Sequence, residues 1–153
     1  MFAALFVAAL ASAPLQANNI VRDVVTNVCL PFADGAGDRA AAEALGFVVL
    51  SEEGRVTEMA TAEAQPRYLL RLTGDDGETD GEVARVCLLQ ARTLNFETTR
   101  NAVRSPLEQA GFIAEAGQPD DRPVWTRGNV TVSVRQNEGR ATMVRVTYSS
   151  FEN

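Results

Sequence analysis

The sequence predicts an α+β domain of two units, each a helix followed by an antiparallel meander, that share one hydrophobic core. Three features support this fold class. Apolar residues recur at helical spacing in each half, alternating segments rich in Val, Leu and Thr follow, and turns rich in Gly, Asn and Asp separate them. The units span residues 18–92 and 93–153, and an internal duplication would explain the repeated order of elements. Neither unit buries enough apolar surface to be stable alone.

The segment before the first unit has the pattern of an export signal. Residues 1–19 carry no charge, and their apolar run ends in small residues and is shorter than the roughly 20 residues of a membrane-spanning helix. Because Pro14 is unfavourable directly after a cut at Ala13, we expect a signal peptide of residues 1–17. No basic residue precedes the apolar run, so a segment retained as an anchor is the alternative. The expected location is the bacterial periplasm or the external medium.

Two helices are predicted at the start of the first unit. The stripe of the first helix consists of Ile20, Val24 and Val28, with Val21, Val25 and Cys29 beside it. Pro31 predicts the end of this helix. A short second helix over residues 39–45 is bracketed by Asp38, which fits an N-cap, and by Gly46, which fits a C-terminal stop. The pair Gly46-Phe47 then leads into the strands.

Two cysteines in an exported chain predict a disulfide bond between Cys29 and Cys87. In its strand, Cys87 shares a face with Arg85, whereas Leu88 points to the other face. The first helix is therefore expected to cross the face that carries Arg85. The apolar run at residues 86–89 also predicts that this strand is covered on both faces.

An acidic stretch, GDDGETDGE, separates the predicted strands 68–72 and 83–89. Five residues fit positions 1, 3, 5, 6 and 8 of a calcium loop, namely Asp76, Glu78, Asp80, Gly81 and Val83. Cys87 stands where that loop requires a bidentate glutamate, and a strand follows where a helix is required. We therefore predict a hairpin turn with neither a metal nor another cofactor, and weak calcium binding is the alternative.

The second unit contains a predicted helix and a terminal hairpin. The helical stripe consists of Phe96, Val103, Leu107 and Ala110. Ser105-Pro106-Leu107-Glu108 has the order of a capping box with proline at the first helical position, so it predicts a helix start, and Gly111 predicts the end. Strands 130–135 and 142–148 flank a turn, and their alternation predicts that one face meets water. Trp125 is expected to be a packing residue.

The composition excludes several kinds of chemistry. The chain has no His and no Lys, since all 14 of its basic residues are Arg. A histidine base, a two-histidine zinc site, a Walker lysine and a lysine Schiff base are therefore excluded. The formal net charge of −6 opposes binding to nucleic acid or to an anionic membrane. A pair of carboxylates is the remaining route to acid–base catalysis.

The adjacent acids offer little support for such a pair. Glu52 with Glu53, and Asp120 with Asp121, lie in polar sequence that is typical of solvated loops and gives no reason for a raised pKa. Ser51 has no base that would activate it. We therefore predict no catalytic residue.

Arg135 and Arg145 are the predicted binding residues. They lie on neighbouring strands of the last hairpin, opposite its valines, where guanidinium groups can bind carboxylates or phosphates in a bidentate manner. A solvated face with cross-strand pairs is the alternative. By exclusion, the sequence favours an exported, non-enzymatic binding or accessory protein of the bacterial cell envelope that contacts a protein partner, as an inhibitor, immunity factor or assembly subunit. The alternatives are a small carboxylate-dependent hydrolase and a carrier of a small ligand or metal.

Overall fold

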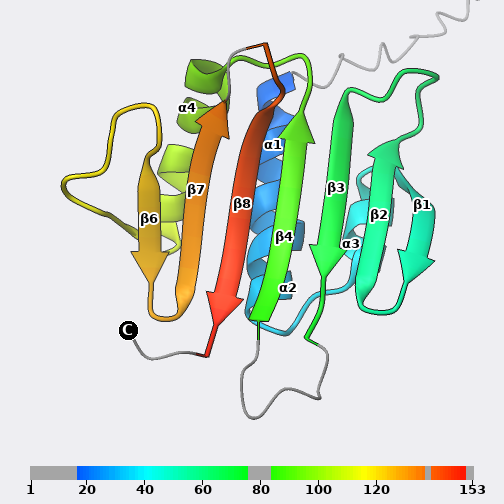
Figure 1. Ribbon diagram of the computed structural model, residues 1–153, viewed down its shortest axis with the longest axis horizontal. Coiled ribbons are helices and arrows are strands. Elements are labelled where there is room, and N and C mark those ends of the chain that lie inside the picture. Colours follow the sequence, from blue (N-terminus) through cyan, green and yellow to red (C-terminus); the bar gives the residue numbers. More distant parts are fainter. Residues whose placement is uncertain (1–16, 76–83, 137–138, 151–153) are drawn as a thin grey trace, which may run out of the picture.

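The computed structural model describes residues 17–75, 84–136 and 139–150 and has an α+β fold, with an eight-stranded antiparallel sheet and helices packed against it (Figure 1). The helical segments are α1 (Ala17–Val24), the π-helical turn η1 (Val25–Cys29), α2 (Leu30–Ala33), α3 (Arg39–Ala44) and α4 (Phe96–Gln109). The strands are β1 (Phe47–Glu53), β2 (Val56–Thr61), β3 (Tyr68–Thr73), β4 (Ala84–Ala91), β5 (Ile113–Ala114), β6 (Val124–Arg127), β7 (Val130–Gln136) and β8 (Thr142–Ser149). The predicted α+β class is confirmed.

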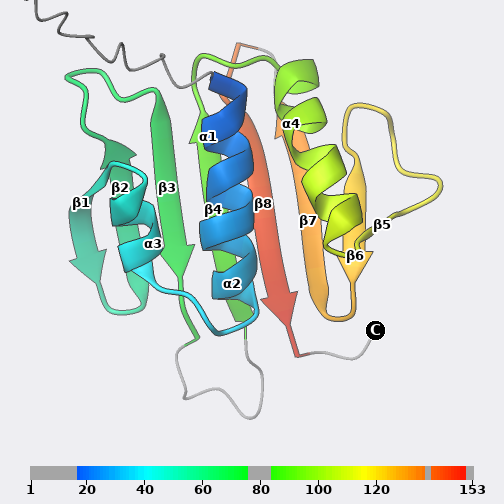
Figure 2. The ribbon, with the colours of Figure 1, turned by 180° about the vertical axis from the view of Figure 1, so that it is seen from behind.

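Each half of the chain contributes four consecutive strands to the sheet. The strand order is β1-β2-β3-β4-β8-β7-β6-β5, so the halves meet where β4 pairs with β8. Seen from behind in Figure 2, the long helix α1-η1-α2 and helix α4 lie side by side across the sheet, with α3 beside β1 and β2. One cluster of buried residues joins both halves, which places a single core between the helices and the sheet.

The core is built from the alternating residues of the strands and the apolar stripe of the first helix. Its fully buried side chains include Val21, Val24, Val28, Leu70, Leu89, Val103, Leu107, Val132, Val144 and Val146. Trp125 is only 3% exposed, so the expectation that it is a packing residue is confirmed, and it lies in the core. Burial of such side chains contributes roughly 1.5–3 kcal/mol each, which makes this layer the main source of stability.

The first helix does not end at Pro31, contrary to the sequence-based expectation. It continues to Ala33, and the backbone before the proline widens into the π turn η1, where Leu30 N–H donates to the Val25 carbonyl. A π turn changes the hydrogen-bond register, and it relieves the clash that a proline ring makes with the carbonyl four residues earlier. The helix ends at Asp34, and Gly35 follows with a φ of 77°.

Helix α4 also begins elsewhere than predicted. Its N-cap is Asn95, whose side-chain oxygen accepts a hydrogen bond from Thr98 N–H at 2.9 Å. The capping-box order at Ser105 therefore marks no helix start, and Pro106 lies inside the helix. Tertiary burial of the stripe that continues through Leu107 outweighs the one hydrogen bond that this proline removes. The predicted ends at Gly46 and Gly111 and the cap at Asp38 are confirmed.

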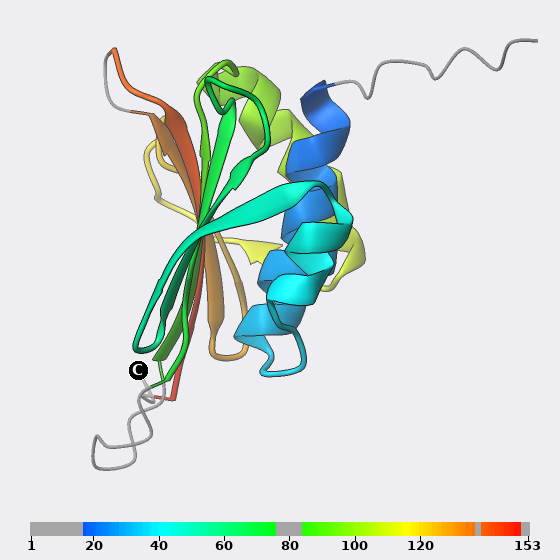
Figure 3. The same ribbon diagram turned by 90° about the vertical axis from the view of Figure 1, so that its right-hand side faces the viewer.

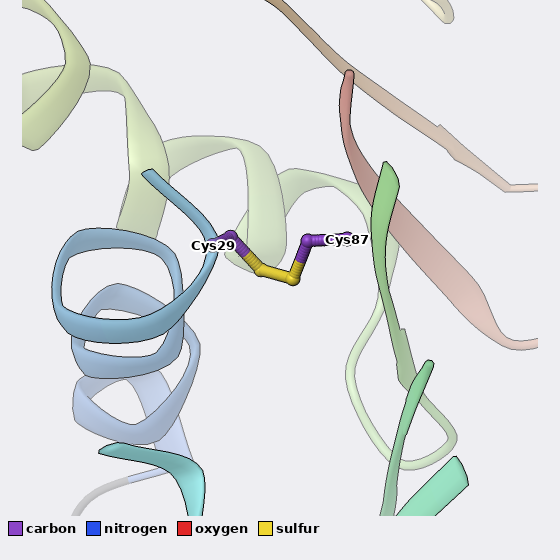
Figure 4. The surroundings of a disulfide bond; sticks show 2 residues. All are labelled: Cys29 and Cys87. Carbon is purple, nitrogen blue, oxygen red and sulfur yellow. A yellow bond between two sulfur atoms is a disulfide. The ribbon is translucent and has the colours of Figure 1, made fainter. Parts of the chain in front are cut away.

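The predicted disulfide bond between Cys29 and Cys87 is present, and it joins the first helix to the central strand β4 (Figure 4). Both cysteines are fully buried. The helix crosses the face of β4 that carries Arg85, as expected, because Arg85 Nε donates to the Ala33 carbonyl at 2.9 Å. The expectation that β4 is covered on both faces is wrong, since the described helices all lie on one side of the sheet (Figure 3).

Two arginines on the covered face of the sheet hold the C-terminal ends of helices. Arg85 donates to the last residue of α2, and its guanidinium lies 4.2 Å from the centre of the Tyr148 ring. Arg127 donates to the Ala110 carbonyl at the end of α4, pairs with Asp34 at 2.8 Å and lies over the ring of Phe112. Positive charge at a helix C-terminus is favourable, so both contacts stabilise the layer packing.

Removal of the disulfide is expected to lower stability strongly. The cysteines are 58 residues apart, and the chain-entropy model assigns about 4 kcal/mol to closing a loop of that size. A Cys29→Ala/Cys87→Ala double variant should therefore lose about this free energy of unfolding in urea titrations. Reductant should destabilise the natural protein but leave the variant unchanged. Equal midpoints for the oxidised protein and the variant would contradict the expected role.

Replacement of Arg127 by lysine should destabilise the protein by about 1 kcal/mol. A lysine ammonium cannot donate in a fork to both the Ala110 carbonyl and Asp34 while stacking on Phe112. Urea unfolding measures the loss, and Arg104→Lys on the exposed surface of α4 is the matched control. A similar effect of both substitutions would show that the fork is not needed.

Candidate functional site

The second face of the sheet has no helix over it within the described part of the chain, and we call it the open face (Figure 3). Its central side chains come from the alternate residues of β3, β4, β8 and β7. They are Leu69, Arg71 and Thr73, then Val86, Leu88 and Gln90, then Met143, Arg145 and Thr147, and finally Thr131, Ser133 and Arg135. The face therefore combines aliphatic, hydroxyl and guanidinium groups in one broad surface.

Arg135 and Arg145 both lie on the open face, where alternation placed them. The register pairs Arg135 with Met143 and Ser133 with Arg145, so the two arginines are diagonal neighbours, about 7–8 Å apart at the backbone. Both side chains are exposed, and neither forms an ion pair or hydrogen bond with the residues that the structure describes. Two unneutralised guanidinium groups at this spacing repel each other and favour an anionic ligand.

The central strands of the open face carry an unbalanced charge. Arg71, Arg135 and Arg145 are the ionisable residues among the open-face positions of β3, β4, β8 and β7, with no carboxylate among them. Arg71 faces Glu58 on β2 at 3.8 Å, which is a weak exposed pair. This positive strip belongs to a chain with a formal net charge of −6, so it is not a consequence of the overall composition.

A shallow hollow of about 150 Å³ lies beside this positive strip. Its apolar lining comes from Leu50, Leu69 and Leu88, and Glu58, Arg71 and Gln90 supply polar groups. The pairing register of β1 with β2 shifts between Val49 and Ser51, and Leu50, at this irregularity, is 60% exposed. The hollow leaves apolar surface in contact with water.

The candidate acids lie far apart and exposed. Glu52 is on β1, where it pairs with Arg39, and Glu53 follows it at the end of that edge strand. Asp120 and Asp121 belong to the loop between β5 and β6, at the opposite edge of the sheet. The two acidic pairs therefore do not share a site.

No group of three or more His, Cys, Asp or Glu residues that could hold a metal ion occurs within residues 17–75, 84–136 and 139–150. The acidic hairpin, with its candidate positions at residues 76–83, lies outside those ranges.

A separate pocket of about 430 Å³ lies where the start of the first helix meets the loop between β2 and β3. Ile20, Leu45 and Tyr68 form its apolar wall, and burial raises the pKa of the Tyr68 hydroxyl. At its rim, hydrogen bonds from the Thr61 hydroxyl and then from Arg67 lower the pKa of Glu63 from 4.5 to about 2. The rim therefore keeps Glu63 and Arg67 as an ion pair, with no net charge, at pH values well above 2.

Comparison of the chain with protein-family models, with curated proteins and with solved structures finds no match. Function is therefore inferred from the residues of the site itself.

The sequence located part of this surface. Alternation placed Arg135 and Arg145 together, but Arg71 and the hollow were not predicted. The apolar run at residues 86–89 predicts a second covering layer over Leu88, which the described residues do not provide. The pairing of β3 with β4 brings Arg71 opposite Leu88, and the pairing of β4 with β8 brings Leu88 opposite Arg145. No local sequence signal specifies this row, because it joins residues of both halves.

The shifted pKa of Glu63 predicts a specific pH dependence. Its folded pKa of about 2 lies below its ordinary 4.5, so its contribution to stability is present above pH 4.5 and is lost as the pH falls toward 2. A carboxyl ¹³C titration by NMR should give a midpoint near 2, and Thr61→Val should raise it. Thr131→Val on the open face is the control and should leave it unchanged. A midpoint near 4.5 in the natural protein would contradict the hydrogen bonds described above.

Proposed function

We propose that the protein is a non-enzymatic binding or accessory protein of the bacterial cell envelope, and that it contacts an acidic protein partner through the open face of its sheet. The observation that carries the proposal is the pair Arg135 and Arg145, which have no ion-pair partner and no covering helix among residues 17–75, 84–136 and 139–150. Guanidinium groups bind carboxylates in a bidentate manner, and apolar surface beside them supplies affinity. Inhibitors, immunity factors and assembly subunits are proteins that act through such surfaces.

The proposed location rests on two features of the chain. A buried disulfide bond is typical of proteins that fold in an oxidising compartment, and the uncharged first 19 residues fit an export signal. Among the described residues, no helix is long and apolar enough to cross a membrane. The periplasm is a compartment that agrees with the disulfide bond and the export signal.

We also infer that the two halves share an origin by internal duplication. In each half helical segments precede four consecutive antiparallel strands, and α3 is the element of the first half that has no described counterpart in the second. From the edge of the sheet to its centre, the strand order is β1-β2-β3-β4 in one half and β5-β6-β7-β8 in the other. The two halves are then equivalent in topology, although their sequences differ, and they join where the last strand of each, β4 and β8, pair with one another.

Capture from an envelope extract tests the proposed surface. The oxidised protein, an Arg135→Ala/Arg145→Ala variant and the control Arg104→Ala are immobilised and exposed to the same extract, and bound proteins are quantified by mass spectrometry. A partner of the open face should be recovered at least about fivefold less by the double variant, because each exposed charge pair contributes up to about 1 kcal/mol. Its recovery should also fall as salt rises.

The control separates charge at this surface from charge in general. Arg104 lies on α4, on the other side of the sheet, so its replacement should not change recovery. Equal recovery of every captured protein by the double variant and the natural protein would exclude the open-face arginines from partner binding.

A further inference from the structure

We propose that the open face binds an extended acidic segment of its partner, with one large apolar side chain in the hollow and two carboxylates on Arg145 and Arg135. Counted along the segment in either direction, the carboxylates occupy the second and fourth positions from the apolar residue. This inference rests on the proposed function, because it specifies which chemistry the partner presents to that face.

The hollow has the size and lining for one side chain. Leu50, Leu69 and Leu88 form the apolar part of the lining, beside Glu58, Arg71 and Gln90, and the open space of about 150 Å³ is similar in volume to enclosed engineered cavities that accept a benzene molecule. Leu50 is 60% exposed on edge strand β1, so water covers apolar surface that an aromatic or branched aliphatic group would displace. A single buried anchor next to polar contacts is the usual arrangement at the centre of a protein interface.

The spacing from the hollow to the arginines matches an extended chain that crosses the strands. The lining of the hollow runs from β1 to β4 and is centred near β3, so Arg145 on β8 is two strand spacings away, roughly 10 Å, and Arg135 on β7 is three away, roughly 14 Å. Alternate residues of an extended segment point to one side and repeat about every 7 Å. The second and fourth residues after the anchor therefore lie about 7 and 13 Å from it, within reach of the long arginine side chains.

Charge identifies the segment as acidic. The central open-face positions hold arginines without carboxylates, and Arg135 and Arg145 lack partners among the described residues. A polyanion such as nucleic acid would be repelled by the remaining negative charge of a −6 chain and would leave the apolar hollow empty. A short segment contacts only this part of the surface. Its carboxylates can pair with the arginines while its one apolar group fills the hollow.

Synthetic peptides test the pattern directly on the intact, oxidised protein. Fluorescence anisotropy compares labelled peptides with the order Phe-x-Glu-x-Glu, in which x is Ser or Gly, and the reversed order Glu-x-Glu-x-Phe. The matched control has the same composition with both glutamates moved by one position, to Phe-Glu-x-Glu-x, which turns them to the other side of an extended chain. At least one of the two patterned peptides should bind about fivefold or more tightly than the control, and binding should weaken as salt rises.

Variants assign the two ends of the peptide. Arg145→Ala and Arg135→Ala should each weaken binding about fivefold, whereas Arg104→Ala should leave it unchanged. Leu50→Ser should weaken binding of the Phe peptide but should have little effect on binding of a peptide in which Ala replaces the Phe. Ile113→Ser is the control for this substitution, since Ile113 is 73% exposed on the opposite edge strand.

The outcomes distinguish this inference from the proposed function. Equal binding of patterned and shifted peptides, or affinity unchanged by Leu50→Ser, would overturn the anchored acidic segment. Tighter binding to phosphatidylserine vesicles than to every peptide would also overturn it, in favour of a membrane ligand. If the peptides fail while the extract partner is still lost from the Arg135→Ala/Arg145→Ala variant, the open face remains the partner site and only the segment pattern is wrong.

Discussion

The structure depends on the attachment of helices to one face of an eight-stranded sheet. The disulfide between Cys29 and Cys87 fixes the first helix covalently to β4, the strand at the centre of the sheet. Because strand side chains alternate, every residue that points toward the helices has a neighbour that points away from them. One-sided coverage therefore creates the buried core on one face of the sheet and the open face on the opposite side of the same strands.

Periodicity predicted the elements of this fold better than local motifs predicted their limits. The apolar stripes found both long helices, and alternation found the strands that now pair as β7 and β8. The helix limits predicted from Ser105 and Pro31 were wrong, because burial of a whole apolar stripe outweighs both local effects. A capping sequence stabilises a helix start by about 1 kcal/mol, and a proline inside a helix costs about 3 kcal/mol. The apolar run in β4 misled for another reason. Val86 and Leu88 are half-buried by their neighbours on β3 and β8, and no described helix covers them.

The candidate site shows the limit of sequence reasoning more clearly. Arg135 and Arg145 belong to one hairpin, so their shared face follows from local alternation. Arg71 and Leu50 come from the other half of the chain, and they reach the same surface only through the pairing of β4 with β8. That pairing is non-local, and nothing in the individual segments specifies it. The position of Leu50 on this surface also depends on the register shift in β1, and strict alternation along the strand does not predict that shift.

The contrast between the arginines of the two faces gives the open face its significance. On the covered face, Arg85 and Arg127 are matched by a helix carbonyl, an aromatic ring and a carboxylate, Asp75 for the first and Asp34 for the second. On the open face, Arg135 and Arg145 have no such partners among the described residues, although the chain as a whole has an excess of acidic groups. If charge were distributed only to satisfy folding, these guanidinium groups would lie where carboxylates are available. Within the part of the chain that the structure describes, these bidentate donors are exposed beside a partly apolar hollow, and a ligand that supplies carboxylates and one apolar group satisfies both at once.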